Sequence, residues 1–396
     1  MVTPPNIEGI NYGSYTAAVP ERRDEPRRRD RNADRPAVPV PRDYRLAGPE
    51  GTAAAARGLV SADWYVSPVP RKRMKELMQR RDSPAIRDTV MWFVLLGGSG
   101  WLAHRVWGTW WAVPVFAVYG VLYGSVADSR WHECAHGTAF KTPWMNTVVY
   151  NVASFMMLRE AVSWKWSHFR HHSDTIIVGR DAEIAFPRPA SILRIAAEVL
   201  AIQSVRAEIR KIAMNCAGRL TAEERDYIPE SERAKAIRTA RVYAFILVGV
   251  SGWSVAMRSL EPLMFVGLPT MYGRWLAVAY GITQHAGLAE DVLDHRLNSR
   301  SVDMNRLHRY LYWNMNFHIE HHMFPTVPYH ALPTLHAEIQ ADLPPICPGL
   351  LAAYREIVPA LLRQRKDIGY CLVPVLPGPQ PTGAASALST LQRAAK

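Results

Sequence analysis

Three compact histidine clusters constrain the fold of this chain more than any other feature of its sequence. They hold eight of its fourteen histidines and read HECAH (His132, His136), HFRHH (His168, His171, His172) and HIEHH (His318, His321, His322). On a helix, residues at i, i+3 and i+4 lie on one face, so each cluster could direct two or three imidazoles at one point. Neutral imidazole is the commonest metal ligand in proteins. We therefore expect a fold that brings the three clusters together around metal.

A ninth histidine extends this set. His285 follows an apolar segment in the sequence GITQHAGL, just as His132 and His136 follow another apolar segment. Nine imidazoles exceed the ligands that one metal can take, so we expect two metals. Imidazole suits iron, zinc, copper and nickel, whereas a structural zinc favours four tetrahedral ligands that include thiolates, for which no cysteine is placed. Two redox metals beside a membrane would indicate oxidation of an apolar substrate.

The apolar segments predict an all-α integral membrane protein. We expect four transmembrane helices, at about residues 89–103, 106–127, 242–257 and 262–283. A full crossing needs about 20 apolar residues, and interfacial Trp, Tyr and basic residues can complete shorter spans. A fifth apolar stretch at 143–158 is predicted to be interfacial or re-entrant. The histidine-rich site would then lie in a cytosolic helical cap.

The distribution of charge predicts the orientation in the membrane. The formal net charge is +12, and a basic run at residues 71–87 precedes the first span. The positive-inside rule places this run in the cytosol, together with both termini and all three histidine clusters. No nucleic-acid motif accompanies the basic residues, so we expect no nucleic-acid partner. The four cysteines have no CxxC spacing, which suits a reducing cytosol.

Four parts of the chain are expected. Residues 1–60 read as a disordered tail rich in Arg and Pro. Residues 61–88 read as a basic amphipathic segment on the membrane surface. Residues 89–345 would form the catalytic membrane domain, and residues 346–396 a cytosolic tail.

Several polar residues remain open to two interpretations. Glu133 and Glu320 lie inside clusters and could orient imidazoles or face solvent, and Asp174 and Asp181 share this ambiguity. Arg274, inside the fourth predicted span, could be functional or could extend its charge to the membrane surface. The remaining histidines are interpreted as structural or exposed: His104, His295, His308, His330 and His336.

With boxes of HxxxH, HxxHH and HxxHH in this order and a four-span layout, the chain resembles the membrane fatty acid desaturase superfamily, which also contains alkane and xylene hydroxylases. The resemblance covers about residues 85–340 and includes HIEHHMFPTVPYHALP, which looks like the third box with its usual continuation. It implies a di-iron centre held almost wholly by histidines, with O₂ as co-substrate. The implied metal and catalytic ligands are His132, His136, His168, His171, His172, His285, His318, His321 and His322.

The resemblance also has implications for subtype and partners. Acyl-CoA desaturases tend to place an asparagine one helical turn before the extra histidine, whereas this chain has Gly281. No cytochrome-like haem domain is evident, so electrons would come from a separate ferredoxin- or rubredoxin-type donor with its reductase. The sequences around the boxes resemble bacterial members, which implies a multi-pass protein of the bacterial inner membrane. Some such members oxidise small non-lipid molecules.

The expected function is an O₂-dependent oxidoreductase that acts on unactivated C–H bonds. The leading interpretation is desaturation or hydroxylation of a fatty acyl or lipid chain; the alternative is hydroxylation or oxidative demethylation of a small non-lipid compound. A remote alternative is a metal-binding membrane protein without activity. The boxes cannot choose between these reactions because the reactions share one ligand set. An apolar substrate is expected to enter from the membrane between the second and fourth spans, past Trp131, Tyr280, Gly281 and Thr283.

Overall fold

The computed structural model describes residues 42–377, all of which belong to one compact unit. Within this range every regular element is a helix, apart from an isolated bridge between Val302 and Cys347. The prediction of an all-α fold is therefore confirmed for the part of the chain that the structure describes.

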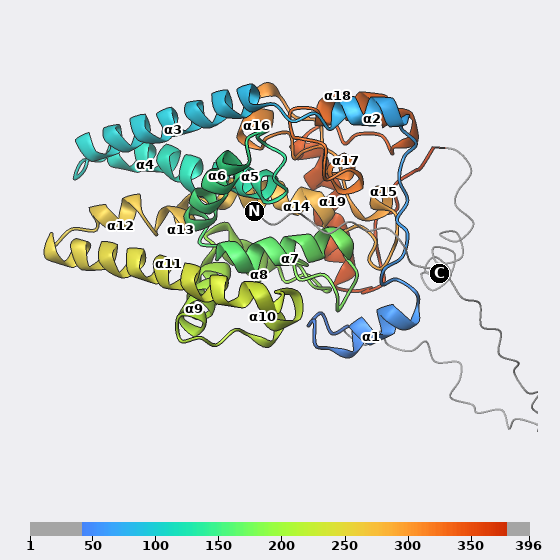
Figure 1. Ribbon diagram of the computed structural model, residues 1–396, viewed down its shortest axis with the longest axis horizontal. Coiled ribbons are helices and arrows are strands. Elements are labelled where there is room, and N and C mark those ends of the chain that lie inside the picture. Colours follow the sequence, from blue (N-terminus) through green and yellow to red (C-terminus); the bar gives the residue numbers. More distant parts are fainter. Residues whose placement is uncertain (1–41, 378–396) are drawn as a thin grey trace, which may run out of the picture. The chain divides into compact units, whose positions relative to one another are not determined.

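The first helical hairpin leads directly into the first histidine cluster. Helix α3 (Asp82–Arg105) packs against α4 (Ala112–Gly120), and the turn between them lies at the left-hand end of Figure 1. Helix α4 continues through a π-helical turn, η1 (Val121–Ser125), into α5 (Val126–Ala135). Such π-turns inside α-helices are frequent at functional sites. Here the continuous helical run ends within HECAH.

The fourth predicted span is not one helix. Helix α11 (Glu230–Ala256) is followed by three short helices, α12 (Glu261–Phe265), α13 (Pro269–Tyr272) and α14 (Trp275–His285). The breaks have a physical cause. Gly267 adopts a φ of +99°, and a Cβ on Gly273 would lie only 1.8 Å from the carbonyl oxygen of Gly120. Glycine therefore permits both the turn and the close approach to the first hairpin.

Ser125 fixes the start of α14 against η1. Its hydroxyl donates to the carbonyl of Gly273 (2.6 Å) and accepts from the backbone N–H of Ala277 (2.9 Å). A Cβ on Gly124 would likewise lie 2.5 Å from the carbonyl oxygen of Pro269. These contacts hold the beginning of α14 beside the helix that ends in the first histidine cluster.

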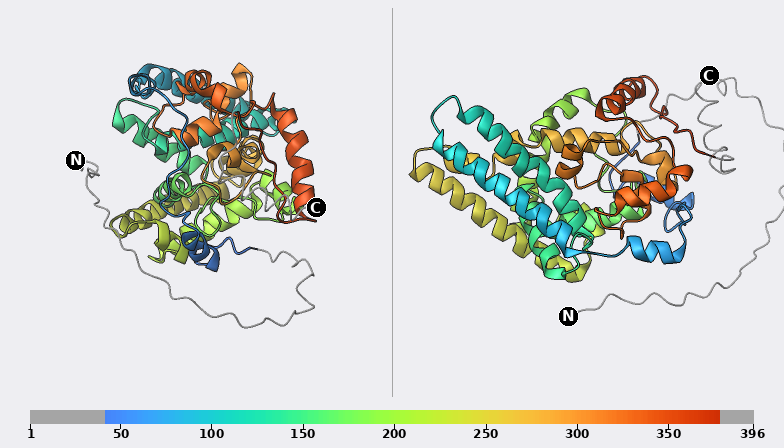
Figure 2. Two further views of the ribbon diagram at one scale, coloured as in Figure 1. Left: turned by 90° about the vertical axis from the view of Figure 1, so that its right-hand side faces the viewer. Right: turned by 90° about the horizontal axis from the view of Figure 1, so that it is seen from above.

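The first hairpin and a second one, formed by α11 and α12, expose apolar side chains. By length and composition, Ala112–Ala135 and Glu230–Ala256 could cross a membrane. Both hairpin turns lie at the same end of the unit, away from α15 and α17–α19 (Figures 1 and 2). The outward residues include Val90, Phe93, Val94, Trp101, Val113, Val118, Phe245, Val248, Trp253 and Val255. Contiguous apolar surface of this kind is expected to meet lipid or a partner rather than water.

The remaining helices surround the ends of α5 and α14. Those before α11 are α6 (Pro143–Met156), α7 (Ala161–Ser173), α8 (Ile192–Val199), α9 (Ile202–Cys216) and α10 (Ala222–Tyr227). Those after α14 are α15 (His295–Asn298), α16 (Arg306–Leu311), α17 (His318–Met323), α18 (Leu332–Ile339), the 3₁₀ turn η2 (Gln340–Asp342) and α19 (Leu350–Gln364). The second histidine box lies on α7 and the third on α17. Helix α6, the fifth apolar stretch, packs against α5.

The expected tails differ from the structure where it describes them. Residues 1–41 and 378–396 lie outside the described residues. Residues 42–60, expected to be disordered, contain helix α1 (Pro49–Ala56), and Arg42 pairs with Glu50 at 2.8 Å. Helix α19, expected to be part of a tail, packs against α14 and buries Ile357 and Leu361. The basic segment forms the short helix α2 (Arg71–Leu77).

Candidate metal centre

The nine predicted histidines converge into two adjacent groups. In each group the candidate ligand atoms lie within 4.8 Å of one another, and neither group includes a carboxylate or thiolate of the described residues. The first group contains His132, His136, His168, His172 and His321, and the second contains His171, His285, His318 and His322. The structure thus brings together every histidine that the sequence singled out. Their assignment as metal ligands stays a prediction.

Each HxxHH box supplies both groups. In HFRHH, His168 and His172 belong to the first group and His171 to the second; in HIEHH, the pair at i and i+4 belongs to the second group and His321 to the first. The expectation that each cluster aims at one point was wrong for these two boxes. Successive residues of a helix differ by about 100° in direction, so i+4 lies about 40° from i on one side and i+3 about 60° from i on the other side of the same face. One helix therefore serves two adjacent sites.

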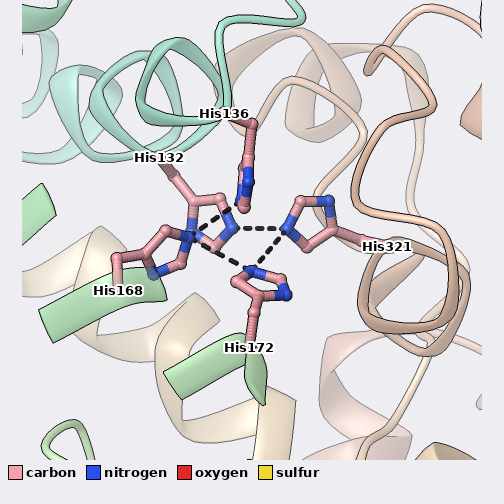
Figure 3. Close-up of side chains that lie close together, drawn as sticks. All are labelled: His132, His136, His168, His172 and His321. Atoms are coloured by element: carbon pink, nitrogen blue, oxygen red, sulfur yellow. Dashed lines mark hydrogen bonds between the residues drawn. The ribbon is translucent and has the colours of Figure 1, made fainter. Parts of the chain in front are cut away.

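The spacing of the imidazole nitrogens fits bound metal. In the first group the Nε2 atoms of His132 and His321 lie 2.7 Å apart, and those of His136 and His168 lie 3.0 Å apart (Figure 3). In the second group the Nε2 atom of His318 lies 3.0 Å from that of His285. Metal–imidazole bonds are about 2.0–2.1 Å long, so two ligands at right angles would be about 3.0 Å apart. The residues present fit metal coordination.

Hydrogen bonds on the far side of the rings orient the nitrogens. The Nδ1 of His285 donates to the backbone carbonyl of Asn298 at 2.8 Å, so in the neutral ring Nε2 carries the lone pair. The Nδ1 of His171 lies 2.8 Å from Oδ2 of Asp181, which also accepts from the backbone N–H of Ile176. Such partners fix the ring and make it a better ligand.

Sequence reasoning missed two of these orienting residues. The carboxylate of Glu183 lies 3.3 Å from Nδ1 of His168, and Asn298 acts through its backbone carbonyl. Glu183 stands two residues after Asp181, so the run of acidic residues in GRDAEI was the available signal. A backbone acceptor such as that of Asn298 leaves no signal in the sequence. Asp174 instead pairs with Arg180 at 3.1 Å.

The two glutamates inside the boxes are buried rather than solvated. Glu133 accepts from the Thr138 hydroxyl at 2.6 Å and from the backbone N–H of Tyr329 at 3.0 Å. Glu320 accepts from the hydroxyl of Ser301 at 2.5 Å and from Nδ1 of His336. Both brace the helices that carry the boxes, and neither hydrogen-bonds to an imidazole of the two groups.

Burial keeps most of the imidazoles neutral. It is the largest cause that lowers the pKa of His172, His318 and His322 well below the ordinary value, and neighbouring imidazoles lower it further. For His171 burial also lowers the pKa, but the Asp181 carboxylate outweighs this effect and the net direction is upward. Neutral rings present lone pairs, the form in which histidine binds metal.

A cavity of about 490 Å³ reaches the two groups. Its wall includes His132 of the first group and His171, His285 and His318 of the second. Trp131 and Gly281 also line it, as predicted. The predicted wall residues Tyr280 and Thr283 do not: the Tyr280 hydroxyl meets Nδ1 of His308 at 2.6 Å, and the Thr283 hydroxyl donates to the carbonyl of Tyr280. The cavity therefore lies beside α14, along a different face from the one expected for these two residues, and the entry of substrate from the membrane stays a prediction.

Comparison with known proteins identifies the family. Residues 108–354 match the fatty acid desaturase family. The chain is 28% identical over 249 residues, or 56% of its length, to the endoplasmic reticulum omega-6 fatty acid desaturase isozyme 1 of Glycine max, of which 64% is covered. It is 22% identical over 257 residues, 58% of its length, to the delta(12)-fatty-acid desaturase of Arabidopsis thaliana, again with 64% covered.

A shorter match is closer in sequence. The chain is 35% identical over 95 residues, 23% of its length, to the delta(12)-acyl-lipid-desaturase of Punica granatum, of which 22% is covered. The chain thus spans less than two thirds of the length of these relatives. Their names are those of enzymes, which agrees with the prediction of an oxidoreductase. With the match across residues 108–354, the chain belongs to the fatty acid desaturase family.

Proposed function

We propose that this protein is a membrane-bound di-iron oxidoreductase that uses O₂ to desaturate a fatty acyl chain. The observation that carries the proposal is the convergence of nine imidazoles into two adjacent groups at one cavity, in a chain of the desaturase family. The names of the relatives favour acyl chains over the small non-lipid alternative.

The donor set supports iron. Five imidazoles in one group and four in the other, without thiolate, are compatible with iron and unlike the thiolate-containing sets typical of structural zinc. Bound iron would supply the activation of O₂ that removal of hydrogen from an unactivated C–H bond requires. The overall reaction balances when a –CH₂–CH₂– unit, O₂, two electrons and two protons give –CH=CH– and two waters.

The chain's own residues would position the metals and the substrate. The histidines hold the metals, while Asp181, Glu183 and the Asn298 carbonyl keep the rings in place. Ala277 and Gly281 line the cavity on the α14 side and leave room for an acyl chain beside His285. Six of the nine imidazoles are buried, which would limit the access of water to the reacting carbon.

Location and electron donor are part of the proposal. The hairpin turns lie at one end of the unit and the histidines away from it, so the metal centre would face the side that carries the basic helix α2. The positive-inside rule makes that side the cytosol, in a bacterial inner membrane. A separate ferredoxin- or rubredoxin-type protein with its reductase would then deliver electrons there.

The test is aerobic turnover of the purified full-length protein with a reductase–ferredoxin pair and acyl substrates under ¹⁸O₂. The expected result is two irons per chain and an unlabelled alkene. An ¹⁸O-labelled alcohol would show that the reaction is hydroxylation and not desaturation. One stoichiometric zinc with no O₂ uptake would overturn the proposal of an oxidoreductase.

A further inference from the structure

One arginine in the wall of the cavity has no bound counter-charge. Arg274 is only 9% exposed and lines the same cavity as the histidines. Its guanidinium makes no hydrogen bond or ion pair with any residue between 42 and 377, and the two partly buried arginines of the same wall differ in this respect. Arg159 pairs with Asp128 at 2.8 Å, and Arg188 pairs with Glu290 at 3.1 Å.

The three carboxylates whose negative charge acts on Arg274 already have other partners. Asp128 and Glu208 each pair with a cation, and both oxygens of Glu198 accept from Ser204, so none of the three forms an ion pair with Arg274. The pairs are Asp128 with Arg159, Glu198 with Ser204, and Glu208 with Lys211. Arg274 also precedes α14, whose N-terminal end adds partial positive charge at the same place.

One face of α14 joins Arg274 to the metal centre. Arg274, Ala277, Val278, Gly281 and His285 all line the cavity, at the i, i+3, i+4, i+7 and i+11 positions of one helix face. With a rise of 1.5 Å per residue, the backbones of Arg274 and His285 are about 16 Å apart along the helix. The residues between them are small or apolar. This face of α14 therefore carries a cation at one end, the apolar strip of Ala277, Val278 and Gly281, and an imidazole at the other end. The other walls contribute charged residues as well, among them Asp128, Glu183, Glu198 and Glu290.

We infer that the cavity binds an amphiphile whose anionic group, a carboxylate or a phosphate, pairs with Arg274 while its hydrocarbon chain runs along α14 toward His285. The reaction at the far end rests on the proposed function, whereas the binding of the anion does not. This assignment makes a charged acyl compound the substrate class and disfavours a neutral alkane.

The chemistry of arginine supports this ligand. A guanidinium presents a planar fork of donors that matches a carboxylate or phosphate in two parallel hydrogen bonds. A buried charge without a partner is costly, so a ligand that supplies the opposite charge gains affinity from Arg274. A neutral head group of the same chain length leaves that cost in place.

The exposed part of the wall shows where such a ligand enters. The exposed residues are Ala185, Pro189, Ser191, Arg194 and Gln203, all in the segment before and within α8 and α9. Arg194 is the rival anion site, because it stands at this mouth and its guanidinium also has no partner among the described residues.

The first experiment uses the unmodified full-length holoprotein in detergent. Equilibrium binding is measured for a long-chain fatty acid, the alcohol of the same length and a lysophosphatidic acid with the same chain. We expect the acid or the phosphate to bind at least about tenfold more tightly than the alcohol, the usual size of a charge-assisted contact. The anion that binds more tightly shows whether the head group is a carboxylate or a phosphate. Equal binding of the acid, the alcohol and the phosphate overturns the assignment.

Variants then locate the anion. Arg274→Gln should weaken binding of the anionic ligand at least about tenfold and leave the alcohol within about threefold. Arg206→Gln is the control, since it removes an exposed arginine of α9 that does not line the cavity. If Arg194→Gln rather than Arg274→Gln abolishes the preference for the anion, the site is at the mouth and the inference fails. Metal content and melting temperature identify a variant that fails to fold. In that case the comparison of acid, alcohol and phosphate binding to the unmodified protein decides whether the cavity prefers an anion.

The two proposals fail separately. If the anion binds at Arg274 but no acyl compound is oxidised, the anion site stands and the proposed function falls. If neutral alkyl compounds are bound and desaturated as well as the acid, the function stands and the anion site falls.

Discussion

The Nδ1 atom of His171 lies 2.8 Å from Oδ2 of Asp181, and the same carboxylate oxygen accepts from the backbone N–H of Ile176. This one contact ties the only HFRHH histidine of the second group to the loop that follows α7. It keeps Nε2 of His171 directed at His285 and His322, whose ring centroids lie 5.3 and 4.9 Å away.

Replacing Asp181 should therefore weaken the metal centre without removing a ligand. We expect Asp181→Asn to lower iron affinity or turnover about 10- to 100-fold, the range for residues that orient metal-bound imidazoles. Metal analysis after dialysis and steady-state turnover measure the effect. Asp174→Asn is the matched control, because Asp174 pairs with Arg180 instead of a histidine. Equal loss of iron in both variants would argue against a specific role of Asp181.

His285 is predicted to be a ligand although it lies outside the three boxes. We expect His285→Ala to lose iron and activity while still entering the membrane, because the second group retains only three of its four imidazoles. His308→Ala is the control, since His308 contacts Tyr280 and belongs to neither group. Full iron content and normal turnover in His285→Ala would show that the residue is only structural.

Gly281 should control how the substrate lies beside the metals. A Cβ at this position would meet nothing closer than Oε1 of Gln284 at 4.0 Å, so a larger side chain extends into the cavity without a backbone clash. We expect Gly281→Leu to shift the preferred chain length or the position of oxidation, because one methylene is worth about 1–3 kcal/mol in an apolar pocket. Product analysis across acyl lengths provides the measurement.

A control for Gly281→Leu is Gly249→Leu on α11, where an added Cβ also meets open space but which does not line the cavity. Unchanged products from both variants would mean that the chain lies along another wall.

Arg130 should contribute to stability rather than chemistry. It is fully buried, donates to the backbone carbonyls of Leu311 (2.6 Å) and Tyr310 (3.1 Å), and lies over the Trp313 ring at 4.8 Å. Arg130→Met would remove the charged donor from both carbonyls, which would keep only the Ser129 hydroxyl at 3.2 Å and the Trp313 backbone N–H at 3.4 Å. It would also remove the contact with the Trp313 ring, and we expect the free energy of unfolding to fall by about 2–4 kcal/mol. Thermal unfolding in detergent should show a lowered melting temperature, while metal analysis should show an unchanged iron content. An unchanged melting temperature would contradict the structural role.

The sequence by itself determined which residues form the candidate site. The spacing of the boxes and the position of His285 after an apolar segment singled out the nine histidines that the structure brings together. Short-range periodicity carries this information, because residues one turn apart on a helix must share a face.

Only the tertiary structure decided how those histidines divide and what surrounds them. The split of each HxxHH box depends on the placement of α5, α7, α14 and α17 around it. Every residue has a backbone carbonyl, so the sequence does not reveal that the carbonyl of Asn298 orients His285. The lack of an ion pair at Arg274 depends on residues distant in sequence. The broken fourth span was likewise hidden from hydropathy, because the close approach of Gly273 to Gly120 is a contact between segments about 150 residues apart, which local pattern does not encode.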